Sequence, residues 1–222
     1  MELPSWLHRL ESRMGHWGIP HLIRGLVLLN CLTFILQSLS PGFGDSLLLD
    51  PRALLKGEVW RMITFLFVPA FSPGSFGMIF FLLSMYFTWF IGDGLEEAWG
   101  PFLLNLYMVV SVVALTAAGL AFYPFPITST FIIASLLFAF ATVYPDLPIM
   151  IFPLPIQIPV KYVAFFSAAL IGLQVLFNPF VAPMVLASLS GYLLFLGPGA
   201  YGRWKMQRDS KQRMKKFRGD DT

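Results

Sequence analysis

Residues 76–122 read FGMIFFLLSMYFTWFIGDGLEEAWGPFLLNLYMVVSVVALTAAGLAF, and this segment sets the fold class. Two apolar runs, Phe76–Gly92 and Pro101–Phe122, flank a short segment with the acidic residues Asp93, Glu96 and Glu97. A helix that crosses a bilayer needs about 20 predominantly apolar residues, with a range that includes both runs. We therefore predict two membrane-spanning helices joined by a short acidic hairpin.

The rest of the chain repeats this pattern. Of its 222 residues, 57% are hydrophobic and 12% are charged, whereas soluble domains have about 45–50% and about 25%. The mean hydropathy is +0.72. This composition excludes a typical soluble enzyme, a disordered protein and a disulfide scaffold. Four further apolar runs predict an all-α polytopic membrane protein with six spans within residues 22–200: Leu22–Leu39, Ile127–Tyr144, Val160–Phe177 and Phe180–Leu196.

Three segments outside these runs have other patterns. Residues 1–21 place apolar side chains at helical spacing, which predicts an amphipathic helix in the membrane interface. The apolar segment Trp60–Phe71 is short and is interrupted by Pro69, which favours an interfacial or re-entrant piece. The segment Pro145–Pro159 contains five prolines, which a spanning helix would not tolerate, so we expect a loop along the interface.

Basic residues predict the orientation. Six spans put both termini on one side, and by the positive-inside rule that side is the cytoplasm. The membrane is then a bacterial inner membrane or the endoplasmic reticulum. We expect the basic tail, residues 201–222, to contact anionic lipid or a soluble partner. Nucleic-acid binding is not expected, because a basic run beside a span is an ordinary topology signal. Eight of the 15 basic residues lie in this tail: Arg203, Lys205, Arg208, Lys211, Arg213, Lys215, Lys216 and Arg218.

Few side chains in the spans can carry chemistry. The three histidines, His8, His16 and His21, precede the first span, and the lone Cys31 permits no internal disulfide. Spans two to six contain essentially no charged residue, which argues against a proton-coupled transporter. No metal site or cofactor is expected. Small residues recur at helical spacing and suit either internal helix packing or a face for a client helix: Ala164, Ala168 and Gly172 on span five, and Ala187 and Gly191 on span six.

Four short motifs occur in a characteristic order: GEVWRMITF at 57–65, GDGLEEAWG at 92–100 with Tyr107 after it, AFATVYP at 139–145, and PVKY at 159–162. Together they resemble the rhomboid superfamily over nearly the whole chain. The resemblance implies a six-transmembrane-helix rhomboid-like bundle with a membrane-associated first loop. It also implies that Trp60 and Arg61 lock this loop into the membrane surface. The alternative is that Trp60 anchors the chain in the membrane interface and that Arg61 only has its hydrogen bonds satisfied. In either case Glu58 and Glu96 are candidate partners for the guanidinium of Arg61.

The catalytic positions of the family have changed type. Rhomboid proteases carry a Gly-x-Ser-Gly nucleophile in span four, where this chain has Thr130. Their histidine base in span six is matched by Ser188, and the oxyanion-side histidine and asparagine of span two by Phe80 and Ser84. Since no histidine follows position 21, the resemblance implies a pseudoprotease. Loss of the base alone lowers the catalytic rate of a triad enzyme by several orders of magnitude.

Three functions remain open. The first is a catalytically inactive, derlin-like membrane protein that binds transmembrane segments of client proteins in quality control or trafficking. The second is a divergent intramembrane protease that uses Ser129, Thr130 or Ser188, for which the sequence supplies no base. The third is a channel or transporter, which the absence of a repeat between the two halves disfavours.

Overall fold

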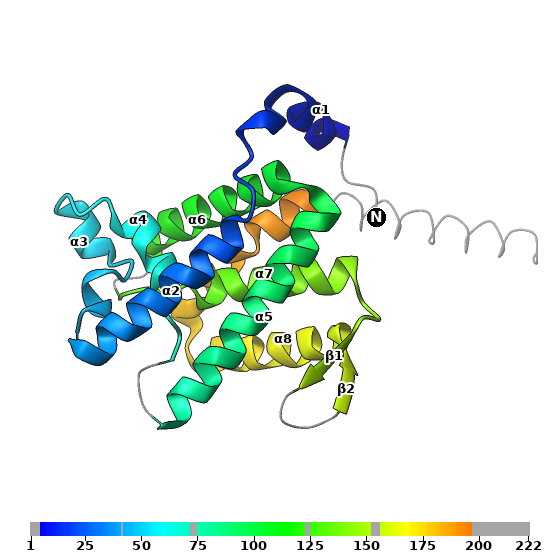
Figure 1. The fold of residues 1–222 in the computed structure, drawn as a ribbon. Coiled ribbons are helices and arrows are strands. Elements are labelled where there is room, and N and C mark those ends of the chain that lie inside the picture. The colour runs from blue at the N-terminus through cyan, green and yellow to red at the C-terminus, as the bar shows by residue number, and fades with distance from the viewer. Residues whose placement is uncertain (1–4, 41, 72–74, 123–124, 152–155, 197–222) are drawn as a thin grey trace, which may run out of the picture.

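The computed structural model describes residues 5–40, 42–71, 75–122, 125–151 and 156–196, and these residues are mostly helical (Figure 1). The basic tail, residues 201–222, lies outside the described residues. The elements are α1 (Ser5–Met14), η1 (Gly15–Trp17), α2 (Leu22–Leu39), η2 (Gly44–Ser46), α3 (Pro51–Leu55), α4 (Arg61–Thr64), η3 (Phe65–Phe67), α5 (Ser75–Trp99), α6 (Pro101–Phe122), α7 (Thr130–Val143), β1 (Pro148–Ile151), β2 (Ile156–Pro159), α8 (Val160–Phe177), η4 (Pro179–Val181) and α9 (Ala182–Ser188).

Four of these helices are long and apolar enough to cross a membrane: α2, α5, α6 and α8. The pair Pro179–Ser188 and Ser190–Leu196, bent by 40°, passes the same test as one broken span. These are the helices of a multi-pass membrane protein. The predicted limits of spans one, three and five agree with α2, α6 and α8. The count of six spans stays a prediction, because α7 has 14 residues and is only about 21 Å long.

Successive long helices run in opposite directions (Figure 1). One end of the bundle holds the start of α2, the end of α5 and the start of α6, and we term it the near end. The end of α7 and the start of α8 also lie there, and the opposite end is termed the far end. His21 confirms the near-end pairing of α2 with α5, since its backbone N–H donates to the Glu96 carboxylate at 2.9 Å.

The predicted acidic hairpin between spans two and three is wrong. Asp93, Glu96 and Glu97 lie in the last turns of α5, which continues to Trp99. Asp93 and Glu96 are tolerated in the helix because Arg24 of α2 and the backbone N–H of His21, just before α2, supply their partners. The chain turns instead at Gly100, whose φ of +79° is in the left-handed region that favours glycine.

The fourth and sixth predicted spans are also altered. The first three residues of predicted span four, 127–129, are not helical, because Ile127 forms an antiparallel bridge with Leu49 of the first loop. The last predicted span breaks near Leu189, so α9 and Ser190–Leu196 form two short helices. Both changes leave non-helical backbone next to short helices, which membrane proteins accommodate where protein or water covers it.

The proline-rich loop contains a β-hairpin that the sequence did not predict. Strands β1 and β2 pair antiparallel, with Pro148 opposite Pro159 and Ile149 opposite Ile158. Proline is compatible with the ends of an edge strand, where its missing N–H removes no required ladder bond. The hairpin lies between the end of α7 and the start of α8 (Figure 1).

Helix α6 is the centre of the bundle. Its buried side chains include Leu104, Tyr107 and Leu115, and it contacts α5, α7 and α9. The amphipathic helix α1, predicted within residues 1–21, packs against α6 and buries Leu7 completely. Helix α8 is peripheral, and Val160 at its start is its buried residue. A bundle centred on α6 therefore carries α8 on its outside.

Candidate functional site

An open apolar groove lies between α5, α7 and α8, and we term it the α5–α8 groove. Its volume is about 280 Å³. Its apolar wall on α5 includes Phe80 and Leu83, and Val163 lies on the α8 side. Phe80 is 52% exposed, so the groove opens at the surface of the bundle.

Two hydroxyl groups of α5, those of Ser84 and Thr88, line this groove. Neither forms a hydrogen bond with another residue in the described part of the chain, although each lies one helical turn after a backbone carbonyl. Other hydroxyls of the bundle use such carbonyls: Thr116 donates to Val112 and Thr142 to Phe138, both at 2.8 Å. Ser84 and Thr88 therefore present free donors on an apolar surface.

The two positions that match the protease dyad have different surroundings. Thr130, at the far end, is exposed, and its hydroxyl accepts a hydrogen bond from Thr128 at 3.0 Å. Ser188 is 3% exposed and donates to the carbonyl of Val185 in its own helix at 2.9 Å. Ser129 is buried and donates to the carbonyl of Val68 at 3.3 Å. Each of these hydroxyls is thus engaged locally, and the described contacts do not join Thr130 to Ser188.

The histidines with described side chains lie away from these positions. His16 is in η1, and His21 precedes α2 at the near end with its side chain 57% exposed. The His21 ring nitrogen Nδ1 is 3.6 Å from the Glu96 carboxylate. Since Thr130 begins α7 at the far end, neither histidine can act as its base.

The oxyanion-side positions of the family resemblance lie on α5. Phe80 stacks on Phe71 with ring centroids 5.7 Å apart. Ser84 follows one turn later and faces the same groove. Both positions thus line the α5–α8 groove, where an aromatic ring and a single hydroxyl offer no pair of convergent donors for an oxyanion.

Arg61 ties the first loop together. Its Nε donates to Glu58 at 2.6 Å, and its Nη1 donates to the carbonyls of Asp45 and Leu48, both at 2.9 Å. Of its two predicted partners, Glu58 is therefore confirmed and Glu96 is wrong, because Glu96 binds His21 instead. The neighbouring Trp60 is 52% exposed at the start of α4.

The small residues divide into two groups. Gly191 packs tightly, since a Cβ there would lie 2.6 Å from Ser111 Oγ and 3.1 Å from the Tyr107 ring. By contrast, nothing lies within 4 Å of a Cβ added at Gly172, and Ala168 is exposed. Internal packing thus explains Gly191 and the half-buried Ala164, whereas Ala168 and Gly172 are exposed.

Two polar contacts between helices were not predicted. Arg24 forms a two-pronged ion pair with Asp93 at 2.8 and 2.9 Å, and Trp89 also donates to Asp93. The spacing of Trp89 and Asp93, four residues apart on one helix, was the available signal. The second contact joins the Tyr107 hydroxyl to the Ser135 hydroxyl and carbonyl. The first contact joins α5 to α2, and the second joins α6 to α7.

Among the described residues, no three His, Cys, Asp or Glu side chains are placed to hold a metal ion. A scan against protein-family models finds no match to the chain, and a search of curated proteins finds no relative. The motifs of the sequence and the geometry of the grooves are therefore the features that bear on function.

Proposed function

We propose that this chain is a catalytically inactive, rhomboid-like membrane protein that binds transmembrane segments of client proteins. In this proposal α7 and the broken last helix complete six spans, and both termini are cytoplasmic. The role is of the quality-control or trafficking type, with client helices and membrane lipid as partners.

The free hydroxyls of Ser84 and Thr88 carry the proposal. A hydroxyl that faces lipid has no water to bond with, so its partner is either a carbonyl of its own helix or a polar group that approaches it. A client helix with a polar residue in mid-membrane has the same deficit. Docking that residue in the α5–α8 groove would satisfy both groups. An interhelical hydrogen bond typically stabilises the association of two helices by about 0.6 kcal/mol, and by up to about 1.7 kcal/mol.

The peripheral position of α8 also favours a client-binding role. A groove between two helices admits a third helix most easily when one wall has few inward contacts. Helix α8 buries Val160 at its near end, while Phe165 and Phe166 are 73% and 65% exposed. The α8 wall can therefore adjust to clients of different shape at little cost in packing.

The surroundings of the hydroxyls support the absence of catalysis. A serine or threonine nucleophile needs a base within hydrogen-bonding reach. Thr130, Ser129 and Ser188 contact other hydroxyls or backbone carbonyls, and neither of these accepts a proton readily. This favours the client-binding role over the divergent protease.

Site-specific photocrosslinking tests the proposal. A benzophenone amino acid would replace Leu83, which lines the groove, or Leu82, the next residue on the same helix, which is 58% exposed outside it. The protein is placed in liposomes with single-span peptides of polyleucine, with or without one central asparagine. We expect the Leu83 probe to label the asparagine peptide preferentially and the Leu82 probe to label both peptides equally.

Removing the hydroxyls sharpens the test. Ser84→Ala and Thr88→Val keep the shape of the groove, and each should reduce the preference for asparagine about threefold. Equal labelling of both peptides by the Leu83 probe would contradict client binding at this groove. A fluorophosphonate probe and a cleavage assay run in parallel, and cleavage that disappears in Ser129→Ala, Thr130→Ala or Ser188→Ala would establish the protease instead.

A further inference from the structure

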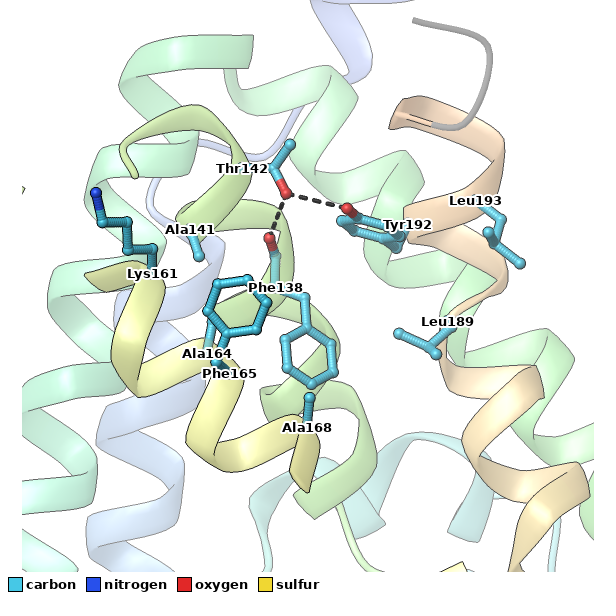
Figure 2. A pocket seen from close by; sticks show the side chains of 10 residues that line it. All are labelled: Phe138, Ala141, Thr142, Lys161, Ala164, Phe165, Ala168, Leu189, Tyr192 and Leu193. Atoms are coloured by element: carbon cyan, nitrogen blue, oxygen red, sulfur yellow. Dashed lines mark hydrogen bonds between the residues drawn. The ribbon is translucent and has the colours of Figure 1, made fainter. Parts of the chain in front are cut away.

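A second groove lies on the opposite side of α8, between α7, α8 and the segment Ser190–Leu196 (Figure 2). We term it the α7–α8 groove. Its volume is about 350 Å³, within the range of about 300–1,000 Å³ typical of small-molecule sites. Its walls are mainly apolar and include Phe138, Ala164, Phe165, Ala168 and Leu193.

The polar groups of this groove gather at one end. Figure 2 shows Lys161, Thr142 and Tyr192 at the end where α7 finishes and α8 begins, and apolar side chains toward the other end. The Thr142 hydroxyl donates to the Phe138 carbonyl at 2.8 Å and lies 3.1 Å from the Tyr192 hydroxyl. The groove is thus amphipathic along its length, with a cation at its near end.

We propose that the α7–α8 groove binds one acyl chain of an anionic phospholipid, with the phosphate held by the Lys161 ammonium group. The apolar walls fit a hydrocarbon chain, and the polar end fits a headgroup at the membrane surface. Basic pockets between transmembrane helices on the cytoplasmic side are the usual setting for such headgroups. The proposal does not depend on client binding, because the two grooves use different residues.

Asp146 competes with the phosphate for Lys161. The Lys161 ammonium lies 2.6 Å from the Asp146 carboxylate, and their side chains are 38% and 78% exposed. Exposed ion pairs contribute little to stability, so the lysine can exchange one anion for another. A phosphate on Lys161 would also be repelled by Asp146, which therefore limits the affinity of the site.

The basic sequence that follows the last helix favours an anionic lipid over a zwitterionic one. The segment Ser190–Leu196 ends at the near end, and the sequence that follows carries eight of the 15 basic residues of the chain. By the positive-inside rule this end faces the cytoplasm, whose leaflet is rich in anionic lipid. Within the groove, Lys161 is the cationic side chain that would meet the anionic headgroup, and its contact with Asp146 must open for that contact to form.

Photoactivatable lipids test the proposal in the full-length protein. Phosphatidylglycerol or phosphatidylcholine with a diazirine in the acyl chain is added as a minor component to phosphatidylcholine nanodiscs. Labelled peptides are then located by mass spectrometry. We expect phosphatidylglycerol to label α8 and the last helix about fivefold more than phosphatidylcholine, the effect of one basic residue near the surface.

Matched variants distinguish binding of the lipid headgroup from binding of the acyl chain. Lys161→Gln should reduce phosphatidylglycerol labelling to the phosphatidylcholine level, whereas Asp146→Asn should increase it. Ala168→Trp fills the groove and should remove labelling by both lipids. Leu170→Trp is the control, because Leu170 lies about 200° around the helix from Ala168 and is 51% exposed.

Three results would overturn the proposal. The first is equal labelling by the two lipids, and the second is a preference for phosphatidylglycerol that survives Lys161→Gln. The third is displacement of both lipids by a single-span peptide that crosslinks to a benzophenone at position 168, which would make the groove a helix-docking site. Since Lys161 and Asp146 are exposed, their variants leave the fold intact and keep the test decisive.

Discussion

Replacing Arg61 by alanine should release the first loop from its fixed position. The change removes the bonds from the guanidinium to Glu58 and to the carbonyls of Asp45 and Leu48. The bond to Leu48 is partly buried, and bonds to charged groups contribute about 1.5–3 kcal/mol. Glu58 is 34% exposed, so that pair adds at most about 1 kcal/mol. The expected loss in the free energy of unfolding is about 2–4 kcal/mol.

Thermal unfolding in detergent measures this loss. The single cysteine, Cys31, is half-buried beside Val27 and Phe34, so a thiol-reactive fluorophore reports its exposure on unfolding. At about 2–4 °C per kcal/mol for a chain of this size, Tm should fall by about 5–15 °C. Arg61→Lys should recover less than half of this, because an ammonium lacks the planar fork.

Arg52 provides the matched control. It lies in α3 of the same loop, and its side chain is exposed. Arg52→Ala should change the free energy of unfolding by less than about 0.5 kcal/mol, as surface substitutions usually do. If Arg61→Ala and Arg52→Ala lower Tm equally, the guanidinium does not hold the loop and the reasoning is wrong.

Three further predictions use the same assay. Gly191→Ala should destabilise the protein by about 1–3 kcal/mol, because its Cβ would lie 2.6 Å from Ser111 Oγ, and Ser111→Ala should restore part of the loss. Asn30→Ala should cost about 1–3 kcal/mol, since it leaves the Leu66 carbonyl without its donor at 2.9 Å. Arg24→Gln should lower Tm less than Arg61→Ala does, because the Arg24 pair is more than one-third exposed, and an equal fall would contradict this.

Sequence alone located the long helices well where both ends of an apolar run are marked. Spans one, three and five are flanked by proline, glycine or polar residues, and α2, α6 and α8 have the predicted limits. The end of α5 was misjudged because acidic residues usually indicate a turn. Its partners, Arg24 and the backbone of His21, lie about 70 residues away in the sequence, so no local pattern reveals them.

The short elements depend on contacts that sequence does not display. The start of α7 is fixed by the bridge between Leu49 and Ile127. The β-hairpin requires Pro148 to face Pro159, a pairing hidden among five prolines. In the first case a segment distant in the sequence decides the local conformation, and in the second the register of two short strands decides it. The hydropathy pattern indicates neither pairing.

The candidate site was predictable in its residue types but not in its arrangement. The sequence analysis placed the hydroxyls of Ser84 and Ser188 on spans two and six, and Thr88 lies one turn after Ser84 on the same span. The structure separates them, because Ser188 bonds to its own helix while Ser84 and Thr88 line a groove and have no hydrogen-bond partner among the described residues. The two grooves beside α8 follow from its peripheral packing, which depends on every other helix. Such a surface has no local signature in the sequence.

The one-residue turn at Gly100 has a consequence for how the chain enters the membrane. Helix α5 ends at Trp99 and α6 begins at Pro101, so a single glycine separates helices of 25 and 22 residues. Because a link this short keeps the end of α5 beside the start of α6, we expect the two helices to leave the translocon together as a hairpin. Asp93 and Glu96 would then meet Arg24 and His21 of a segment that is already inserted. Lengthening this link would separate the two insertion events.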